Sequence, residues 1–168
     1  MKIAGIELGQ PSEIIIPIIR GDQEVIFQAS CIIDFDELNK VLVEPEPPSI
    51  LKRGETIPAP VFNDSKYLKA ISDYSANKMS WMICKSLLAT ENLEWDTIDF
   101  SNPETWKNYE SELKSVGFNE FQIMQLVRGV MEANGLSGER IVEARKRFLA
   151  TKQEAKASSS LQVEQPNI

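Results

Sequence analysis

The 168-residue chain contains no histidine and only two cysteines. Histidine is the commonest general base and the commonest transition-metal ligand, so its absence excludes His-dependent catalytic triads and His-based zinc sites. Cys31 and Cys84 are far apart in sequence, lie in apolar surroundings and lack the CxxC spacing of a metal or redox motif. We therefore predict that both are buried free thiols.

Long apolar runs and an excess of positive charge are also missing. No apolar run approaches the roughly 20 residues needed to span a bilayer, and the first ten residues lack the apolar core of a signal peptide. The formal net charge is −7, whereas proteins that bind nucleic acid or anionic membranes usually carry excess Lys and Arg. These features predict a cytosolic protein without membrane association, and they argue against a general nucleic-acid binder.

Motifs for catalysis or cofactor binding are absent as well. The sequence has no G-x-S-x-G, no P-loop and no dinucleotide-binding fingerprint. Acidic pairs occur at Asp34 with Asp36 and at Glu44 with Glu46, but nothing supplies the remaining ligands of a cation site. The "RGD" at residues 20–22 lies between two strand-like runs and is interpreted as a turn. We predict no enzymatic activity, no catalytic residues, no metal ion and no cofactor.

The first 43 residues predict a small β-rich region. Two β-branched runs, 14–19 and 25–30, flank the polar, glycine-containing residues 20–23, which is the composition of a β-hairpin. Because Pro17 has no N–H to donate, its strand should lie at an edge or carry a bulge. Residues 2–8 predict a further strand. Residues 34–42 predict a short helix capped by Asp34 or Asp36.

Five prolines separate this region from a helical domain over residues 64–155. The prolines keep residues 44–63 extended, as a linker or as a strap over the core. A long helix should follow Asp64, because apolar residues recur there at helical spacing. Its predicted apolar stripe consists of Tyr67, Leu68, Ile71, Tyr74, Trp81, Met82 and Leu88.

Three further helices are expected before a disordered tail at 156–168. The first starts at Pro103, after Ser101 or Asn102 as cap, and ends at Gly117; the second starts at Asn119; the third is capped by Ser137. The predicted fold is therefore α+β: an N-terminal β-hairpin region with a short helix, a Pro-rich connector and a C-terminal bundle of about four helices. Predicted core residues of these helices are Trp106, Tyr109, Leu113, Val116, Ile123, Leu126, Val127, Val130, Met131, Ile141, Ala144, Phe148 and Leu149.

The last helix is the most basic part of the chain. Residues 138–156 carry six basic and three acidic side chains, a balance that a DNA recognition helix would need. However, the positive charges gather toward the end of the helix, where they also complement the helix dipole. The first half, where base contacts usually lie, holds two Glu. DNA binding is therefore the weaker hypothesis.

Several stretches taken in order resemble the tail assembly chaperones of tailed bacteriophages. They are "EPEPP", the helix "W-M-x-x-K-S-L" followed by "LEWDTIDFSNPETW", and the closing "G-F-N-E … V-M-E-A-N-G-L … A-R-x-x-F-L". The resemblance covers roughly residues 12–150. The polar residues after 151 are compatible with the short, non-frameshifted product that many such genes encode.

The resemblance implies a role in virion assembly without catalysis. Chaperones of this kind bind the tape measure protein, keep it soluble and help to recruit tail-tube subunits around it. They act in the host cell cytoplasm and are absent from the mature virion. Self-association remains open. The alternatives are a head–tail connector or tail component retained in the virion, and a DNA-binding regulator.

The partner-binding surface is assigned to the last helix. Its candidate residues are Arg145, Arg147, Phe148 and Leu149, which combine positive charge with apolar area. The competing interpretation is that Phe148 and Leu149 pack on the preceding helices as part of the core.

Overall fold

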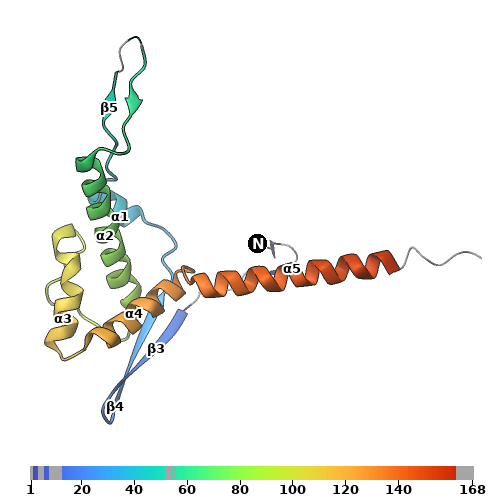
Figure 1. The fold of residues 1–168 in the computed structure, drawn as a ribbon. Helices are drawn as coiled ribbons and strands as arrows, with labels where there is room; N and C mark the ends of the chain where they lie inside the picture. The colour runs from blue at the N-terminus through green and yellow to red at the C-terminus, as the bar shows by residue number, and fades with distance from the viewer. Residues whose placement is uncertain (1, 4–5, 8–12, 52–53, 55, 162–168) are drawn as a thin grey trace, which may run out of the picture. The chain divides into compact units, whose positions relative to one another are not determined.

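The computed structural model describes the backbone of residues 2–3, 6–7, 13–51, 54 and 56–161, and the side chains of 13–51, 54 and 56–150. The chain divides into two units, Met1–Gly135 and Leu136–Ile168, which we describe separately. An antiparallel β-hairpin near the N-terminus is followed by about four helices (Figure 1). The predicted α+β class is confirmed.

The hairpin consists of β3 (Glu13–Arg20) and β4 (Gln23–Ser30), joined by a two-residue turn at Gly21 and Asp22. Gly21 has φ +58°, a backbone conformation that glycine adopts readily. Side chains alternate between the two faces of the hairpin. The inner face buries Ile16, Ile18, Phe27 and Ala29, whereas Ile15, Ile19 and Ile26 are exposed on the outer face.

Side chains from helices satisfy the open edges of this hairpin. Pro17 pairs with Ile26 in an uninterrupted register, so its strand lies at an edge without a bulge, as the missing N–H requires. The Pro17 and Ile19 carbonyls accept hydrogen bonds from the side-chain amides of Gln125 and Gln122, at 3.0 and 2.9 Å. On the β4 edge, the Thr90 hydroxyl accepts from Gln28 N–H and donates to Gln28 C=O. These contacts occupy backbone groups that would otherwise invite pairing with another strand.

Two helices begin where the sequence predicted a helix start, whereas α1 (Asp36–Val41) has Phe35 at its N-cap without a side-chain hydrogen bond, so the predicted cap at Asp34 or Asp36 is wrong. Asp64 accepts hydrogen bonds from the N–H groups of Lys66 and Tyr67, and Asn119 forms a capping box with Gln122. Gly117, at φ +89°, follows the helix that ends at Ser115 and turns the chain there. The elements of the first unit are α1 (Asp36–Val41), α2 (Ser65–Leu87), the 3-10 helix η1 (Pro103–Asn108), α3 (Tyr109–Ser115) and α4 (Glu120–Ala133).

One hydrophobic core joins the hairpin to the helices. The inner face of the hairpin packs on α4 and on the second half of α2. The 3-10 helix η1 also packs on α2, and its Trp106 is part of the core. Gly129 of α4 lies directly against Ile16, which allows the helix to approach the strand closely. The largest fully buried side chains are Trp81, Trp106, Ile18, Leu38, Ile83, Leu87, Leu126 and Val130.

Some predicted core positions are exposed. Leu68 of the predicted stripe is 51% exposed because the core covers only the middle and second half of α2, and Leu88, 40% exposed, lies just after the last residue of that helix. Val116 is 60% exposed because α3 ends at Ser115 and the chain turns at Gly117. The predicted apolar stripe and helix face therefore extend beyond the buried core.

Residues 44–63 contain a narrow β-ribbon. Strands β5 (Ser49–Ile50) and β6 (Ala59–Pro60) pair antiparallel, and Val61 N–H donates to the Pro48 carbonyl at 2.8 Å. The ribbon extends away from the hydrophobic core (Figure 1) and exposes Ile50, Leu51 and Ile57. Residues 52–53 and 55 of the predicted linker or strap lie outside the described residues.

The N-terminal residues form two short strands where one had been predicted. Strands β1 (Lys2–Ile3) and β2 (Ile6–Glu7) pair antiparallel, so residues 2–8 do not form a single strand. Residues 4–5 and 8 of that prediction lie outside the described residues.

The second unit is dominated by one helix, α5 (Gly138–Leu161). All its described side chains, at 138–150, are exposed. Ile141, Ala144, Phe148 and Leu149 are therefore exposed, contrary to the prediction that they belong to the core. The helix also continues through Leu161, into the predicted disordered tail at 156–168; residues 162–168 lie outside the described residues.

The close approach of α4 to β3 predicts that Gly129→Ala is destabilising. A Cβ at residue 129 would overlap the Cγ1 and Cδ1 atoms of Ile16. Since both residues are buried, we expect the free energy of unfolding to fall by about 1–3 kcal/mol. Urea denaturation followed by tryptophan fluorescence measures this change. Gly138→Ala, where a Cβ meets no atom within 4 Å, is the control; equal stabilities of the two variants would contradict the close approach.

Candidate functional site

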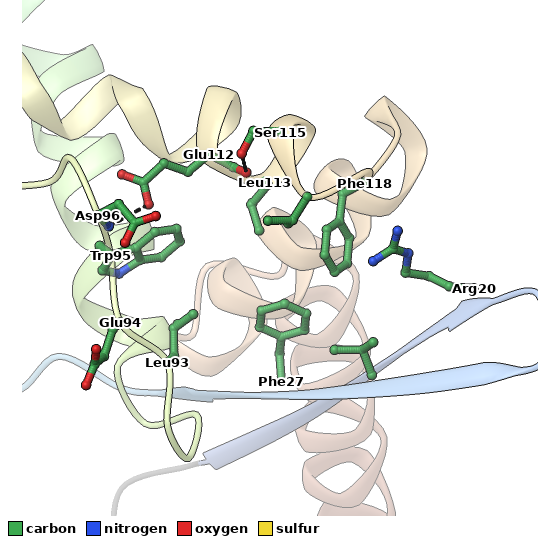
Figure 2. A pocket seen from close by; sticks show the side chains of 12 residues that line it. Arg20, Phe27, Leu93, Glu94, Trp95, Asp96, Glu112, Leu113, Ser115 and Phe118 are labelled. Atoms are coloured by element: carbon green, nitrogen blue, oxygen red, sulfur yellow. Dashed lines mark hydrogen bonds between the residues drawn. The ribbon is translucent and has the colours of Figure 1, made fainter.

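A pocket of about 290 Å³ opens in the first unit (Figure 2). It lies between the inner face of the β3–β4 hairpin, the segment 93–96 that follows α2, and the end of α3. Its apolar walls come from Val25, Phe27, Leu93, Trp95, Leu113 and Phe118. The volume suits one or two apolar side chains of a partner better than a cofactor.

A guanidinium group lies at one end of this pocket. The Cζ atom of Arg20 is 4.9 Å from the centroid of the Phe118 ring, within the range of a cation–π interaction. Phe118 in turn meets Phe27 edge to face, with ring centroids 5.6 Å apart. A Cβ at residue 117 would lie only 2.7 Å from Arg20 Nη2, so Gly117 leaves the space that the guanidinium occupies.

Carboxylates lie at the other end. Glu112 of α3 accepts hydrogen bonds from the Asp96 and Thr97 N–H groups, at 3.0 and 2.6 Å, and from the Thr97 hydroxyl. These bonds hold the segment 93–97 against α3. Glu94 and Asp96 add two further acidic groups to the rim (Figure 2).

A hydroxyl group also lines this pocket. The Ser115 hydroxyl that lines the pocket donates to the Glu112 carbonyl at 2.7 Å, so no base activates it there. Within the described residues, no group of three His, Cys, Asp or Glu side chains could hold a metal ion. The pocket can therefore accept an apolar side chain, with positive charge at one end and negative charge at the other.

The two cysteines differ in environment. Cys84 is fully buried, and its thiol donates to the Trp106 carbonyl at 3.6 Å. Burial, reinforced by the negative charge of Glu112, raises the pKa of the Cys84 thiol to about 12. Burial also raises the pKa of the Tyr109 hydroxyl. The prediction of buried free thiols is confirmed for Cys84, whereas Cys31 is free but only half-buried.

The predicted partner-binding residues lie on α5, in the second unit. Phe148 is 65% exposed and Leu149 is 51% exposed, and Arg145 and Arg147 lie within one turn of them. The helix thus brings all four candidates together over little more than one turn. The pocket in the first unit was missed, because Arg20, Trp95 and Phe118 are distant in sequence and form no local motif.

Comparison of the chain with protein-family models, curated proteins and solved structures gives no match. Across the described residues, no helix has the length and apolar character required to cross a membrane.

We expect Glu112→Ala to loosen the wall of the pocket. The variant removes the acceptor for two backbone N–H groups and one hydroxyl, and should lower the free energy of unfolding by about 1–2 kcal/mol. Urea denaturation measures the loss, and a red shift of the folded protein's tryptophan emission should report greater exposure of Trp95. Glu94→Ala, an exposed rim carboxylate, should change stability by no more than about 0.5 kcal/mol. An unchanged Glu112→Ala variant would contradict the assigned role.

The raised pKa of Cys84 predicts a loss of stability at high pH. Above the ordinary thiol pKa of 9.0 the unfolded chain releases the proton, whereas the folded protein keeps it up to about pH 12. The free energy of unfolding should therefore fall as pH rises through this window. Urea midpoints between about pH 8 and about pH 10.5 test this, and Cys84→Ala should show a shallower slope that retains the Tyr109 contribution. Identical slopes would show that Cys84 does not contribute.

Proposed function

We propose that this protein is a tail assembly chaperone of a tailed bacteriophage. Two features support the proposal: the ordered resemblance over residues 12–150, and the exposure of every described side chain of α5. The protein would bind the tape measure protein during tail assembly, keep that protein soluble and help to recruit tail-tube subunits. It would work in the host cytoplasm and leave before the virion is complete.

The exposed apolar side of α5 is the observation that carries the proposal. Ile141, Val142, Phe148 and Leu149 are each half or more exposed, on a helix whose described side chains are all exposed. Helices in proteins gain most of their stability from packing an apolar face, and isolated helices are marginal in water. A helix of this kind gains stability when another apolar surface covers it, which is how a holdase binds its client.

The tape measure protein suits this mode of binding. It is expected to be largely a long amphipathic helix, which exposes apolar area before the tail tube surrounds it. Contact between two helices covers that area reversibly and forms no covalent bond, in agreement with a pocket that holds no catalytic pair. Release then requires only that tail-tube subunits compete for the same surface.

Co-expression tests the proposal. The full chain is produced together with the long helical tail protein encoded in the same genome, and the soluble fraction of that protein is measured. We expect a several-fold increase in solubility and co-purification of the two chains. The variant Phe148→Ala with Leu149→Ala should lose most of this increase, whereas Phe62→Ala, an exposed aromatic of the first unit, should retain it.

Two other outcomes would favour the alternative functions. Stoichiometric amounts of the chain in purified virions would replace the chaperone by a connector or tail component. Binding to duplex DNA that weakens steeply with salt would instead indicate a regulator. Either result, together with no gain in solubility of the tail protein, would overturn the proposal.

A further inference from the structure

Acidic and basic side chains lie on different sides of α5. Successive residues of an α-helix are rotated by about 100°, so residues 138–150 divide into two sides. One side carries the apolar residues Ile141, Val142, Ala144, Phe148 and Leu149. Glu139 and Glu143 lie on the opposite side, where they face away from any surface that covers the apolar residues.

The cationic groups, in contrast, lie on or beside the apolar side. Arg145 falls between Ile141 and Leu149 in projection, in the middle of this side. Arg140 and Arg147 border it on one flank, and Lys146 borders it on the other. A partner that covers the apolar residues must therefore also meet positive charge at its centre and along both edges.

We propose that α5 binds an amphipathic helix whose apolar stripe is bordered and interrupted by Asp or Glu residues. This inference rests on the proposed function and narrows it to the chemistry of the bound segment. A carboxylate placed opposite Arg145 would form charge-assisted, bidentate hydrogen bonds as the apolar side chains meet. The same charges would steer the encounter and fix the register of the two helices.

A second copy of α5 does not meet this requirement. Two such helices packed by their apolar sides would bring Arg145 of each copy toward the cationic centre and flanks of the other. Like charges at a desolvated contact are strongly unfavourable, and within residues 138–150 both carboxylates, Glu139 and Glu143, lie on the opposite side. The charge pattern therefore selects a partner of different sequence and opposes pairing of α5 with itself.

Two designed peptides test the inference directly. Each is a helix of about 28 residues with the same Leu and Ile stripe; one carries Glu beside and within the stripe, and the other carries Lys at those positions. Binding of the labelled peptides to the full-length chain is measured by fluorescence anisotropy. We expect the Glu peptide to bind at least about tenfold more tightly, and this preference to shrink as salt rises.

Substitutions on α5 separate the contribution of its positive charges from that of its apolar side chains. Arg145→Glu with Arg147→Glu should reverse the preference in favour of the Lys peptide. Phe148→Ala should weaken binding of the Glu peptide by about tenfold or more, as expected for an aromatic anchor. Phe62→Ala should change neither affinity. Unchanged urea unfolding of the first unit in each variant establishes that its fold is intact.

Three results would overturn the inference. These are equal binding of both peptides, persistence of the original preference in the charge-reversed variant, and a dimer of the chain that dissociates on Phe148→Ala. Other results would distinguish failure of the proposed chaperone function from failure of this inference. Selective binding of the Glu peptide without any gain in solubility of the tail protein would reject the chaperone and keep the helix specificity. A gain in solubility that charge reversal leaves unchanged would keep the chaperone and reject the helix specificity.

Discussion

The close contact between α4 and the inner face of the β3–β4 hairpin is the constraint on which the first unit depends. A two-stranded hairpin is marginal by itself in water, so it needs a helix to cover its apolar face. Gly129 allows α4 to approach Ile16, and Gln122 and Gln125 of the same helix bind carbonyls on the outer edge of β3. The same helix therefore closes the core and protects an edge strand.

The pocket of Figure 2 is a consequence of this packing. Arg20 ends β3, Phe118 precedes α4, and their stacking connects the hairpin to the turn between α3 and α4. Glu112 then holds the segment after α2 through its backbone N–H groups. The walls of the pocket are thus tied together by a cation–π contact at one end and by charge-assisted hydrogen bonds at the other.

Charge is distributed unevenly along the chain. The chain as a whole has a formal net charge of −7, yet residues 138–156 carry an excess of positive side chains. The first unit has a closed core, whereas the described side chains of α5 are exposed. The chain thus combines a folded unit with a helix whose described side chains bring positive charge beside apolar area.

Local rules were sufficient to predict the hairpin, the caps at Asp64 and Asn119, and the end of a helix at Gly117, because each depends on residues that are neighbours in sequence. The burial of α5 was predicted wrongly, since periodicity shows which residues share a face and not whether another element covers it. The pocket was not predicted, because its residues come from three segments that are distant in sequence. The sequence alone therefore determined most of the helices, the main hairpin and the distribution of charge. Only the tertiary structure decided which apolar faces are paired in the core, because that pairing depends on contacts between residues far apart in the chain.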